Sequence, residues 1–410
     1  MAELDEILEK YTNPETGTIQ GASFVAVGKN GDFIYRKAAG SQKANGGTSY
    51  PLTLDTVTWI ASQTKLTTSV SVMQLVEKGL VALDDDVRGI LPVLKDIKVI
   101  TGFEDDDTAP GGGHPIFEDV KGPITLRQLV THSSGFRYDT RHPLLIKYSK
   151  WAGRTENMFS GTIEGCLHPL IFQPGTSWDY GPGLDWAGRV IEAVTGMPYD
   201  EYQQEHIWKP LGAADTTFFP AKRGLTLWDI QETAERGEGG GLEAGRSPWL
   251  FECRDALGGA GLFSTANDYV KLLGTLLAGG GPLLSSTSVD VLFAPQTLAP
   301  EASAALRTFV TGSSPQKSKS WLWDSDPDNW RDYMEIKHCL CGLVNKEDVP
   351  GRRHKNTVNW DGLPNLLWFI DREGGVAATF FTQIMPPDDA EIRKLCQELE
   401  TALYKIVDSK

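Results

Sequence analysis

The first forty residues change from helix-like to strand-like spacing of their apolar side chains. Residues 4–11 place Leu, Ile and Tyr at three- and four-residue intervals, which predicts an amphipathic helix. Residues 20–40 contain two apolar runs that flank the turn sequence Lys29-Asn30-Gly31, and Asn-Gly is a strong hairpin signal. The chain is therefore predicted to begin with a helix and a β-hairpin.

Helical spacing returns in the next part of the chain. From Ser62 to Lys78 apolar side chains recur every three or four residues, and Gly79 follows as the expected C-cap. From about residue 124 to 215 helical patterns dominate, with a clear case at 184–194. The middle of the chain is thus predicted to be mainly helical.

Three segments lack this periodicity and are predicted to be loops. Residues 100–122 are acidic and rich in glycine, which favours a surface loop. Residues 220–256 contain a glycine cluster and are expected to form a long loop. Residues 310–333 are polar and contain three tryptophans.

Strand-like apolar runs return in the last part of the chain. Two apolar runs, 366–370 and 376–381, are separated by a Gly-Gly pair, which predicts a second hairpin before a closing helix at about 388–407. Early and late strands around a helical middle indicate an α+β fold: one antiparallel sheet flanked by helices, with an inserted helical lobe. We expect residues 1–95 and 258–410 to form the sheet domain and 96–257 the helical lobe. The active site is expected in the cleft between them.

Composition excludes several functions. The 410 residues carry a formal net charge of -15, which argues against nucleic acid and against an anionic membrane surface. No stretch approaches ~18 consecutive apolar residues, so no membrane span is predicted. The N-terminus lacks the basic start and apolar run of a secretory signal, and a cytoplasmic location is expected.

The five cysteines are odd in number and scattered, which fits a reducing compartment better than a disulfide framework. Cys339-x-Cys341 is readable as part of a metal site, but two buried strand cysteines on one face are the favoured interpretation. No metal and no cofactor are predicted.

Ser62-Gln63-Thr64-Lys65 is the first candidate for chemistry. A serine hydroxyl is a poor nucleophile until another group takes its proton, and helix positions i and i+3 share a face. Lys65 can therefore reach Ser62, provided that burial or nearby cations keep its amine neutral. Ser314 to Lys317 repeats the spacing, but it contains a proline and lies in a polar segment, so the helical copy is preferred.

Two further segments add candidate groups. Tyr180 lies in Trp178-Asp179-Tyr180-Gly181-Pro182-Gly183, just before a predicted helix, where its hydroxyl could shuttle a proton. Trp360-Asp361-Gly362-Leu363 enters a late strand, and its glycine would let backbone N–H groups approach a substrate carbonyl.

Together these segments resemble the serine beta-lactamase and penicillin-binding-protein superfamily, in its class C-like esterase branch. Residues 124–135, with Thr131-His132-Ser133-Ser134-Gly135, and the Gly-rich stretch 258–265 carry further matches in family order. The segments around residues 142–145, 180–188 and 362–368 resemble in particular fungal acyltransferases and esterases of polyketide pathways, among them those of lovastatin biosynthesis.

The resemblance implies a role for each matching residue. Ser62 matches the acylated serine of the family's first motif, Ser-x-x-Lys, and Lys65 matches its lysine. Tyr180 matches the proton-shuttling tyrosine of the second motif. Trp360 and Gly362 occupy the third motif, and the backbone N–H groups of Ser62 and Leu363 would form the oxyanion hole. For His132 we expect a structural role in satisfying loop backbone groups.

Two departures from the family pattern bear on the substrate. Pro182 stands where the second motif usually has Asn, and Trp360 stands where the third usually has a cation that anchors a carboxylate. Both losses weaken recognition of penicillins and D-alanyl peptides and suit a bulky, apolar ester. Lys355 remains a possible nearby cation.

The sequence therefore predicts a serine ester hydrolase or acyltransferase that works through an acyl-Ser62 intermediate on a small-molecule, polyketide-like ester. Its acyl donor could be a thioester or an acyl carrier. Two alternatives stay open: a beta-lactamase or D-alanyl peptidase, and a member of the superfamily that only binds. The sequence does not decide between water and an alcohol as acceptor, or between Lys65 and Tyr180 as the main base.

Overall fold

The computed structural model describes residues 1–44, 50–104, 113–311 and 335–409. The tryptophans at 321, 323 and 330 and the second Ser-x-x-Lys sequence at 314–317 lie outside these ranges.

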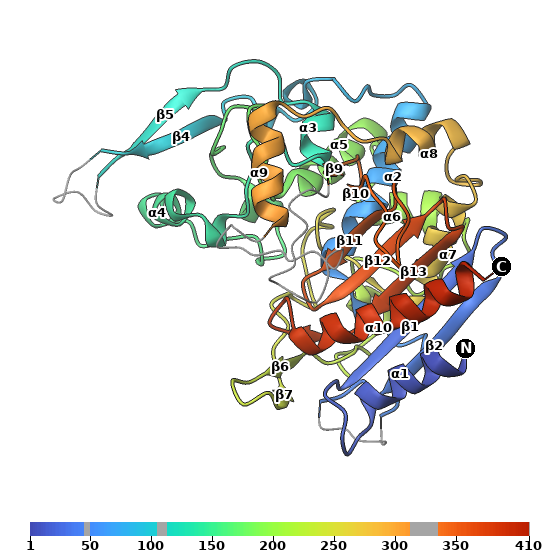
Figure 1. Ribbon diagram of the computed structural model, residues 1–410. Helices are drawn as coiled ribbons and strands as arrows, with labels where there is room; N and C mark the ends of the chain where they lie inside the picture. The colour runs from blue at the N-terminus through green and yellow to red at the C-terminus, as the bar shows by residue number, and fades with distance from the viewer. Residues whose placement is uncertain (45–49, 105–112, 312–334, 410) are drawn as a thin grey trace.

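A seven-stranded antiparallel sheet joins the two ends of the chain, as predicted (Figure 1). Its spatial order is β2-β1-β13-β12-β11-β10-β9. The first hairpin meets the last strands directly, because Ser23 pairs with Phe381 and Gly28 with Val376. The strands are β1 (Gly21–Gly28), β2 (Phe33–Gly40), β9 (Ile336–His338), β10 (Leu343–Asn345), β11 (Val358–Gly362), β12 (Leu366–Asp371) and β13 (Val376–Phe381).

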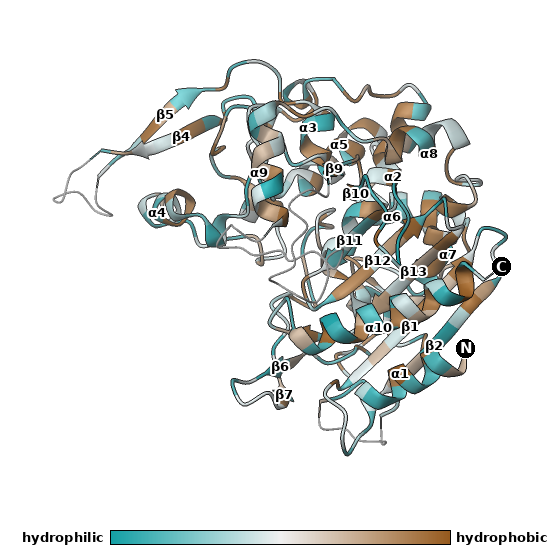
Figure 2. Cartoon of the chain, in the orientation of Figure 1, coloured by the Kyte–Doolittle hydropathy of each residue, from teal (hydrophilic) through white to brown (hydrophobic). Residues whose placement is uncertain are grey.

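The sheet separates two hydrophobic cores. On one face, α1 (Ala2–Thr12) and α10 (Ala390–Val407) pack on alternate strand residues such as Phe24 and Phe380. On the other face, α7 (Ala266–Leu277) packs on β1 and β13, and residues such as Val25 and Phe381 join the larger core. Because successive strand side chains point to opposite faces, one run of apolar residues supplies both cores. Figure 2 shows hydrophobic segments in β12 and β13, with hydrophilic segments along α1 and α10.

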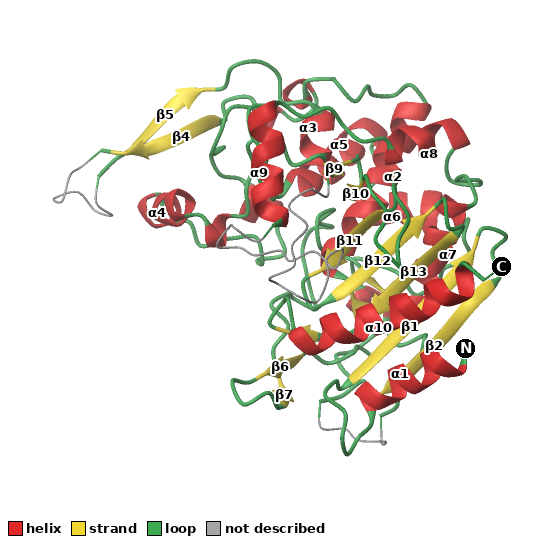
Figure 3. Ribbon diagram, viewed as in Figure 1, coloured by secondary structure: helices red, strands yellow, loops and turns green. Residues whose placement is uncertain are grey.

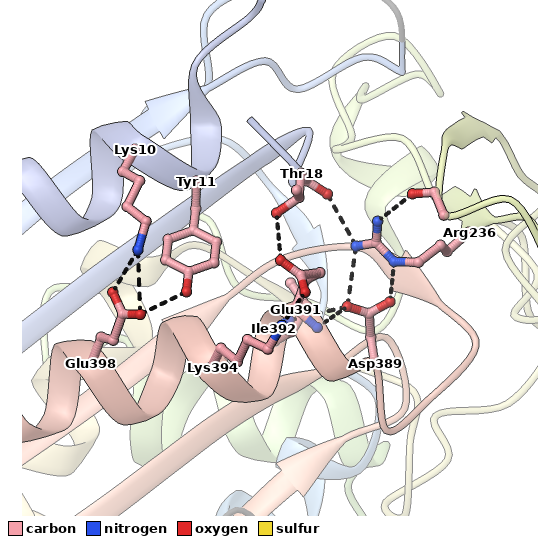
Figure 4. Close-up of polar contacts among 10 residues, drawn as sticks. Lys10, Tyr11, Thr18, Arg236, Asp389, Glu391, Ile392, Lys394 and Glu398 are labelled. Carbon is pink, nitrogen blue, oxygen red and sulfur yellow. Dashed lines mark hydrogen bonds and ion pairs between the residues drawn. The ribbon is translucent and has the colours of Figure 1, made fainter. Parts of the chain in front are cut away.

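Polar contacts fasten α10 to the segments beside it (Figure 4). Glu398 accepts hydrogen bonds from Tyr11 at 2.8 Å and from Lys10 at 3.3 Å, which ties α10 to α1. Asp389 caps the start of α10 and pairs with Arg236, whose guanidinium also donates to the Thr18 carbonyl at 3.0 Å.

The remaining helices gather on the α7 side and form the helical region (Figure 3). The longest of them, α2, is buried along almost its whole length and contacts α5 and α8. These helices are α2 (Thr64–Glu77), α3 (Leu126–Val130), α4 (Pro143–Trp151), α5 (Gly183–Thr195), α6 (Tyr199–Gln203), α8 (Ser286–Phe293) and α9 (Pro300–Val310).

The loop prediction for residues 100–122 is wrong in part. β4 (Lys98–Phe103) and β5 (Pro115–Asp119) pair as an antiparallel hairpin that projects from the helical region (Figure 1). Few of its side chains are buried, so the strands lack the alternation that marks a half-buried sheet. Within 220–256, the short strands β6 (Ala234–Arg236) and β7 (Leu242–Ala244) pair, and β6 also pairs in parallel with β14 (Ile384–Met385).

Candidate active site

Ser62 lies in a tight turn that leads from a strand into α2. The lead-in strand β3 (Thr58–Trp59) pairs with β8 (Phe263–Ser264), and Ile60 donates its N–H to the Leu262 carbonyl at 3.0 Å. A 3₁₀ turn, Ala61–Gln63, follows before α2 begins. Ala61 has a φ of 46°, a left-handed conformation that costs a non-glycine residue roughly 1–3 kcal/mol. Such strain is typical of functional sites, where the surrounding structure enforces it.

Lys65 is one turn further along and is almost completely buried. Its Nζ lies 3.2 Å from Ser62 Oγ, 3.1 Å from Tyr138 Oη and 2.6 Å from the Gly259 carbonyl oxygen. An ammonium has three N–H donors, so each has a partner. Burial lowers the pKa of Lys65 to about 7, although the nearby carboxylates Asp185 and Asp361 oppose the shift. A large share of the lysine is therefore neutral at physiological pH.

Tyr180 completes the cluster from the opposite side. Its hydroxyl donates to Ser62 Oγ at 2.5 Å, and Lys65 Nζ lies 4.5 Å from the centre of its ring. Burial raises the pKa of Tyr180 above its usual value of 10. At neutral pH Tyr180 is thus a proton donor, whereas Lys65 is partly a proton acceptor.

His132 holds the loop that presents Tyr180, as expected. Its Nδ1 accepts the Gly181 N–H at 3.4 Å, and its carbonyl accepts the Asp179 N–H at 3.0 Å. The imidazole also packs against the Tyr180 ring, with centroids 4.8 Å apart. Burial keeps the pKa of His132 well below 6.5, so the ring is neutral and able to accept.

The third motif lies in β11, an interior strand of the sheet that contacts the turn holding Ser62. Trp360 packs on Tyr180, with ring centroids 5.5 Å apart, and lies in β11. A Cβ on Gly362 would stand 2.8 Å from the Ile60 carbonyl oxygen, so only glycine allows this approach of the two backbones. Leu363 follows directly and lines the pocket.

The predicted residues therefore surround one pocket. Ser62, Tyr180, Trp360, Gly362 and Leu363 line it, and Lys65 lies beneath Ser62. Much of the remaining wall is aromatic or apolar, contributed by Trp59, Tyr138, Met158, Phe159, Trp249, Ala260 and Phe309.

Sequence reasoning missed two groups that act on Lys65. Tyr138 accepts a hydrogen bond from it and comes from the loop after α3. Asp185, buried in α5, accepts the Gly259 N–H at 2.8 Å and so holds in place the residue whose carbonyl oxygen accepts from Lys65. No local pattern distinguishes either residue, because only the tertiary fold brings them to Lys65.

The expected anchor Lys355 is not part of this wall. It is exposed and absent from the pocket lining, and its backbone N–H donates to Asp348. The cations that line the pocket within the described ranges are Arg137 and Arg141.

The cysteines do not build a metal centre. Cys339 and Cys341 are buried thiols with sulfurs 3.6 Å apart, as the favoured interpretation has it, although they lie in the turn between β9 and β10 and not in a strand. Across the described residues, no group of three or more His, Cys, Asp or Glu could hold a metal ion. In the same part of the chain, no helix is long and apolar enough to cross a membrane.

The chain is similar to known proteins both in sequence and in structure. The Beta-lactamase family matches residues 4–401. The chain is 38% identical to a lovastatin esterase from Penicillium rubens, over 92% of each chain. It is 31% identical to the monacolin J acid methylbutanoyltransferase of Aspergillus terreus, over 94% of this chain and 92% of that one. The unliganded simvastatin synthase (LovD) of Aspergillus terreus superposes with a TM-score of 0.85 at 30% identity, covering 100% of this chain and 99% of that one.

Proposed function

The chain belongs to the Beta-lactamase family and is a serine esterase or acyltransferase with the beta-lactamase/transpeptidase-like fold, and on this premise we propose that Ser62 carries the acyl group. One observation carries the proposal. Ser62 Oγ lies within hydrogen-bonding distance of both Lys65 Nζ and Tyr180 Oη, in the wall of an aromatic pocket. We also propose that this pocket marks the cleft between the sheet domain and the helical lobe.

Lys65 is the general base of acylation in this proposal. In its neutral form, the lone pair faces Ser62 while the two remaining N–H groups hold Tyr138 and Gly259. The Ser62 proton passes to Lys65 as the oxygen attacks the ester carbonyl. The backbone N–H groups of Ser62 and Leu363 stabilise the oxyanion.

Tyr180 is the general acid for the leaving group. Its raised pKa keeps the hydroxyl protonated, and that hydroxyl contacts Ser62 from the pocket side. Tyr180 donates its proton to the departing oxygen or sulfur and is reprotonated from Lys65. Deacylation reverses these roles, with water or an alcohol as the acceptor.

The proposed substrate is a bulky, apolar ester of the statin type. The relatives named above act on lovastatin or on monacolin J acid, and the walls formed by Trp59, Trp249 and Phe309 suit an apolar polyketide. We propose a thioester on an acyl carrier as the donor for the transfer reaction. The five free thiols fit a cytoplasmic enzyme.

Pro182 and Trp360 disfavour a beta-lactamase or D-alanyl peptidase. Pro182 is the N-cap residue of α5 and has no side-chain amide, and Trp360 is packed against the Tyr180 ring. Pro182 therefore offers no side-chain amide to pair with the substrate amide, and Trp360 has no positive charge to anchor a carboxylate.

Intact-protein mass spectrometry with a lipophilic acyl ester tests the proposal. We expect a mass increase that maps to Ser62 and is absent in Ser62→Ala. The matched control is Ser314→Ala, which alters the other Ser-x-x-Lys sequence and should acylate like the wild type. An adduct that passes to an added polyketide alcohol indicates a transferase, whereas equal loss with and without the alcohol indicates an esterase. Wild-type turnover in Ser62→Ala would exclude Ser62 as the nucleophile.

A further inference from the structure

The pocket extends past Ser62 to the end of β11, where one acidic side chain lacks a partner. Asp361 lies between Trp360 and Gly362, is half-buried and lines the pocket. Successive strand residues point to opposite faces, so Asp361 points away from Trp360 and toward the segment that precedes α10. In the described part of the chain, no hydrogen bond or ion pair holds its carboxylate. Its oxygens are therefore available to a ligand in the pocket.

The neighbouring polar side chains of the pocket wall are already engaged. Asn365 donates to two backbone carbonyl oxygens at 2.7 and 2.9 Å, and its own side-chain oxygen accepts a backbone N–H at 3.1 Å. Asp388 forms an ion pair with Arg393 at 3.0 Å. A ligand group that enters this end of the pocket therefore meets the carboxylate of Asp361 as its hydrogen-bonding partner.

Asp361 is charged at neutral pH. Burial raises the pKa of its carboxyl to about 6, a shift that Lys65 opposes and Asp388 increases. About nine-tenths of the side chain is therefore ionised at pH 7 and about one-tenth at pH 5. In return, the carboxylate raises the pKa of Lys65 and of Tyr180, so its charge acts on the reacting centre.

This carboxylate lies beside the position that the ester would occupy. β11 contacts the turn that holds Ser62, and the proposed function assigns half of the oxyanion hole to the N–H of Leu363, two residues after Asp361. The groups next to the reacting ester therefore come nearest to Asp361. A hydroxyl there gains a charge-assisted hydrogen bond, whereas a carboxylate there is repelled.

We propose that Asp361 is a specificity residue that selects esters with a hydroxyl beside the reacting ester group and rejects esters with an anion there. The inference rests on the proposed function, since it concerns the substrate of the same pocket. It goes beyond the missing cation at Trp360, because a missing anchor only leaves a carboxylate unassisted, whereas Asp361 opposes it. The preferred substrates are accordingly neutral, hydroxylated esters.

Asp361→Asn tests the proposal, because the amide keeps the shape of the side chain and removes its charge. The matched control is Asp96→Asn, which removes an exposed carboxylate outside the pocket lining. Each protein is assayed on three esters of one fatty acid, formed with glycolic acid, with methyl glycolate and with ethylene glycol, by release of the fatty acid. A second set carries the carboxylate, its methyl ester or a hydroxymethyl group on the acyl chain, so either side of the ester can face Asp361.

We expect clear discrimination by the wild type at pH 7 in at least one set. By kcat/KM, the carboxylate ester should be at least about tenfold poorer than its methyl ester, and the hydroxyl ester about tenfold better. Asp361→Asn should remove most of both differences, and Asp96→Asn should remove neither.

The discrimination against the carboxylate should also depend on pH. In the wild type it should shrink between pH 7 and pH 5, as Asp361 becomes protonated while the substrate remains ionised. In Asp361→Asn it should stay flat over the same range. Because each ratio compares two substrates of one enzyme, the titration of Lys65 cancels.

Two outcomes would overturn the inference: equal ratios in the wild type and Asp361→Asn, or a change of the same size in Asp96→Asn. Failure of the proposed function is distinguishable from both. It would appear as neutral-ester turnover that persists in Ser62→Ala. Failure of the specificity role alone would appear as a Ser62 acyl adduct in an enzyme whose Asp361→Asn variant keeps the wild-type ratios.

Discussion

The hydroxyl of Tyr180 donates to Ser62 Oγ across 2.5 Å, whereas the hydroxyl of Tyr138 contacts Lys65. Two tyrosines therefore flank one lysine, but only one of them donates to the proposed nucleophile.

Tyr180→Phe should lower kcat on a neutral ester about 10²- to 10⁴-fold, the usual contribution of a general acid. Tyr138→Phe removes a hydrogen bond to Lys65 and should cost about tenfold or less. Stopped-flow acylation rates for both variants measure the difference. Equal losses would contradict the assignment of Tyr180 as the acid.

The pH profile should report the protonation of Lys65. Its neutral form is the active base and its pKa is about 7, so kcat/KM for a neutral ester should fall about tenfold per pH unit below 7 and level off above it. Asp185→Asn removes a carboxylate that raises the pKa of Lys65, while the amide oxygen can still accept the Gly259 N–H. The midpoint should therefore move to lower pH. A shift to higher pH would contradict this account of Lys65.

Gly362→Ala should impair acylation through the backbone. The added Cβ would stand 2.8 Å from the Ile60 carbonyl oxygen, and Ile60 precedes Ser62 by two residues. Displacement of the nucleophile by a fraction of an ångström should lower kcat by about tenfold to hundredfold. Gly89→Ala is the control, because a Cβ there meets nothing within 4 Å. Similar rates for the two variants would mean that the Gly362 approach does not position Ser62.

The buried pair Arg353–Glu400 should behave as a unit. The two side chains are 1% and 5% exposed, and their atoms lie 2.9 Å apart. Arg353→Met leaves a buried carboxylate unpaired and should lower the free energy of unfolding by about 3–5 kcal/mol. Adding Glu400→Leu should recover most of that loss, as measured by urea unfolding at pH 7. An additive loss in the double variant would argue against coupling.

Periodicity and turn chemistry predicted the parts of the fold that bury one face. The structure confirms the closing helix and the hairpins around Asn30-Gly31 and Gly374-Gly375. Each was predictable because its apolar side chains recur with the period of a strand or a helix that faces a core. The β4–β5 hairpin was not predicted, because few of its side chains are buried and its sequence therefore lacks the alternation of a half-buried sheet. The proximity of Ser62 and Lys65 followed from helical spacing, but the positions of Tyr138, Asp185 and Arg141 depend on loops and helices distant in sequence. No local pattern encodes such contacts.

The central sheet also separates two engineering problems. Everything proposed to act on the ester lies on the α7 side or at the strand ends, whereas α1 and α10 close a second core on the other side. Stabilising substitutions at that second core, for instance around Leu8 or Leu399, should add to the tolerance of the enzyme for heat or solvent without reshaping its specificity. The fold thus offers a biocatalyst whose durability and selectivity can be evolved in separate libraries.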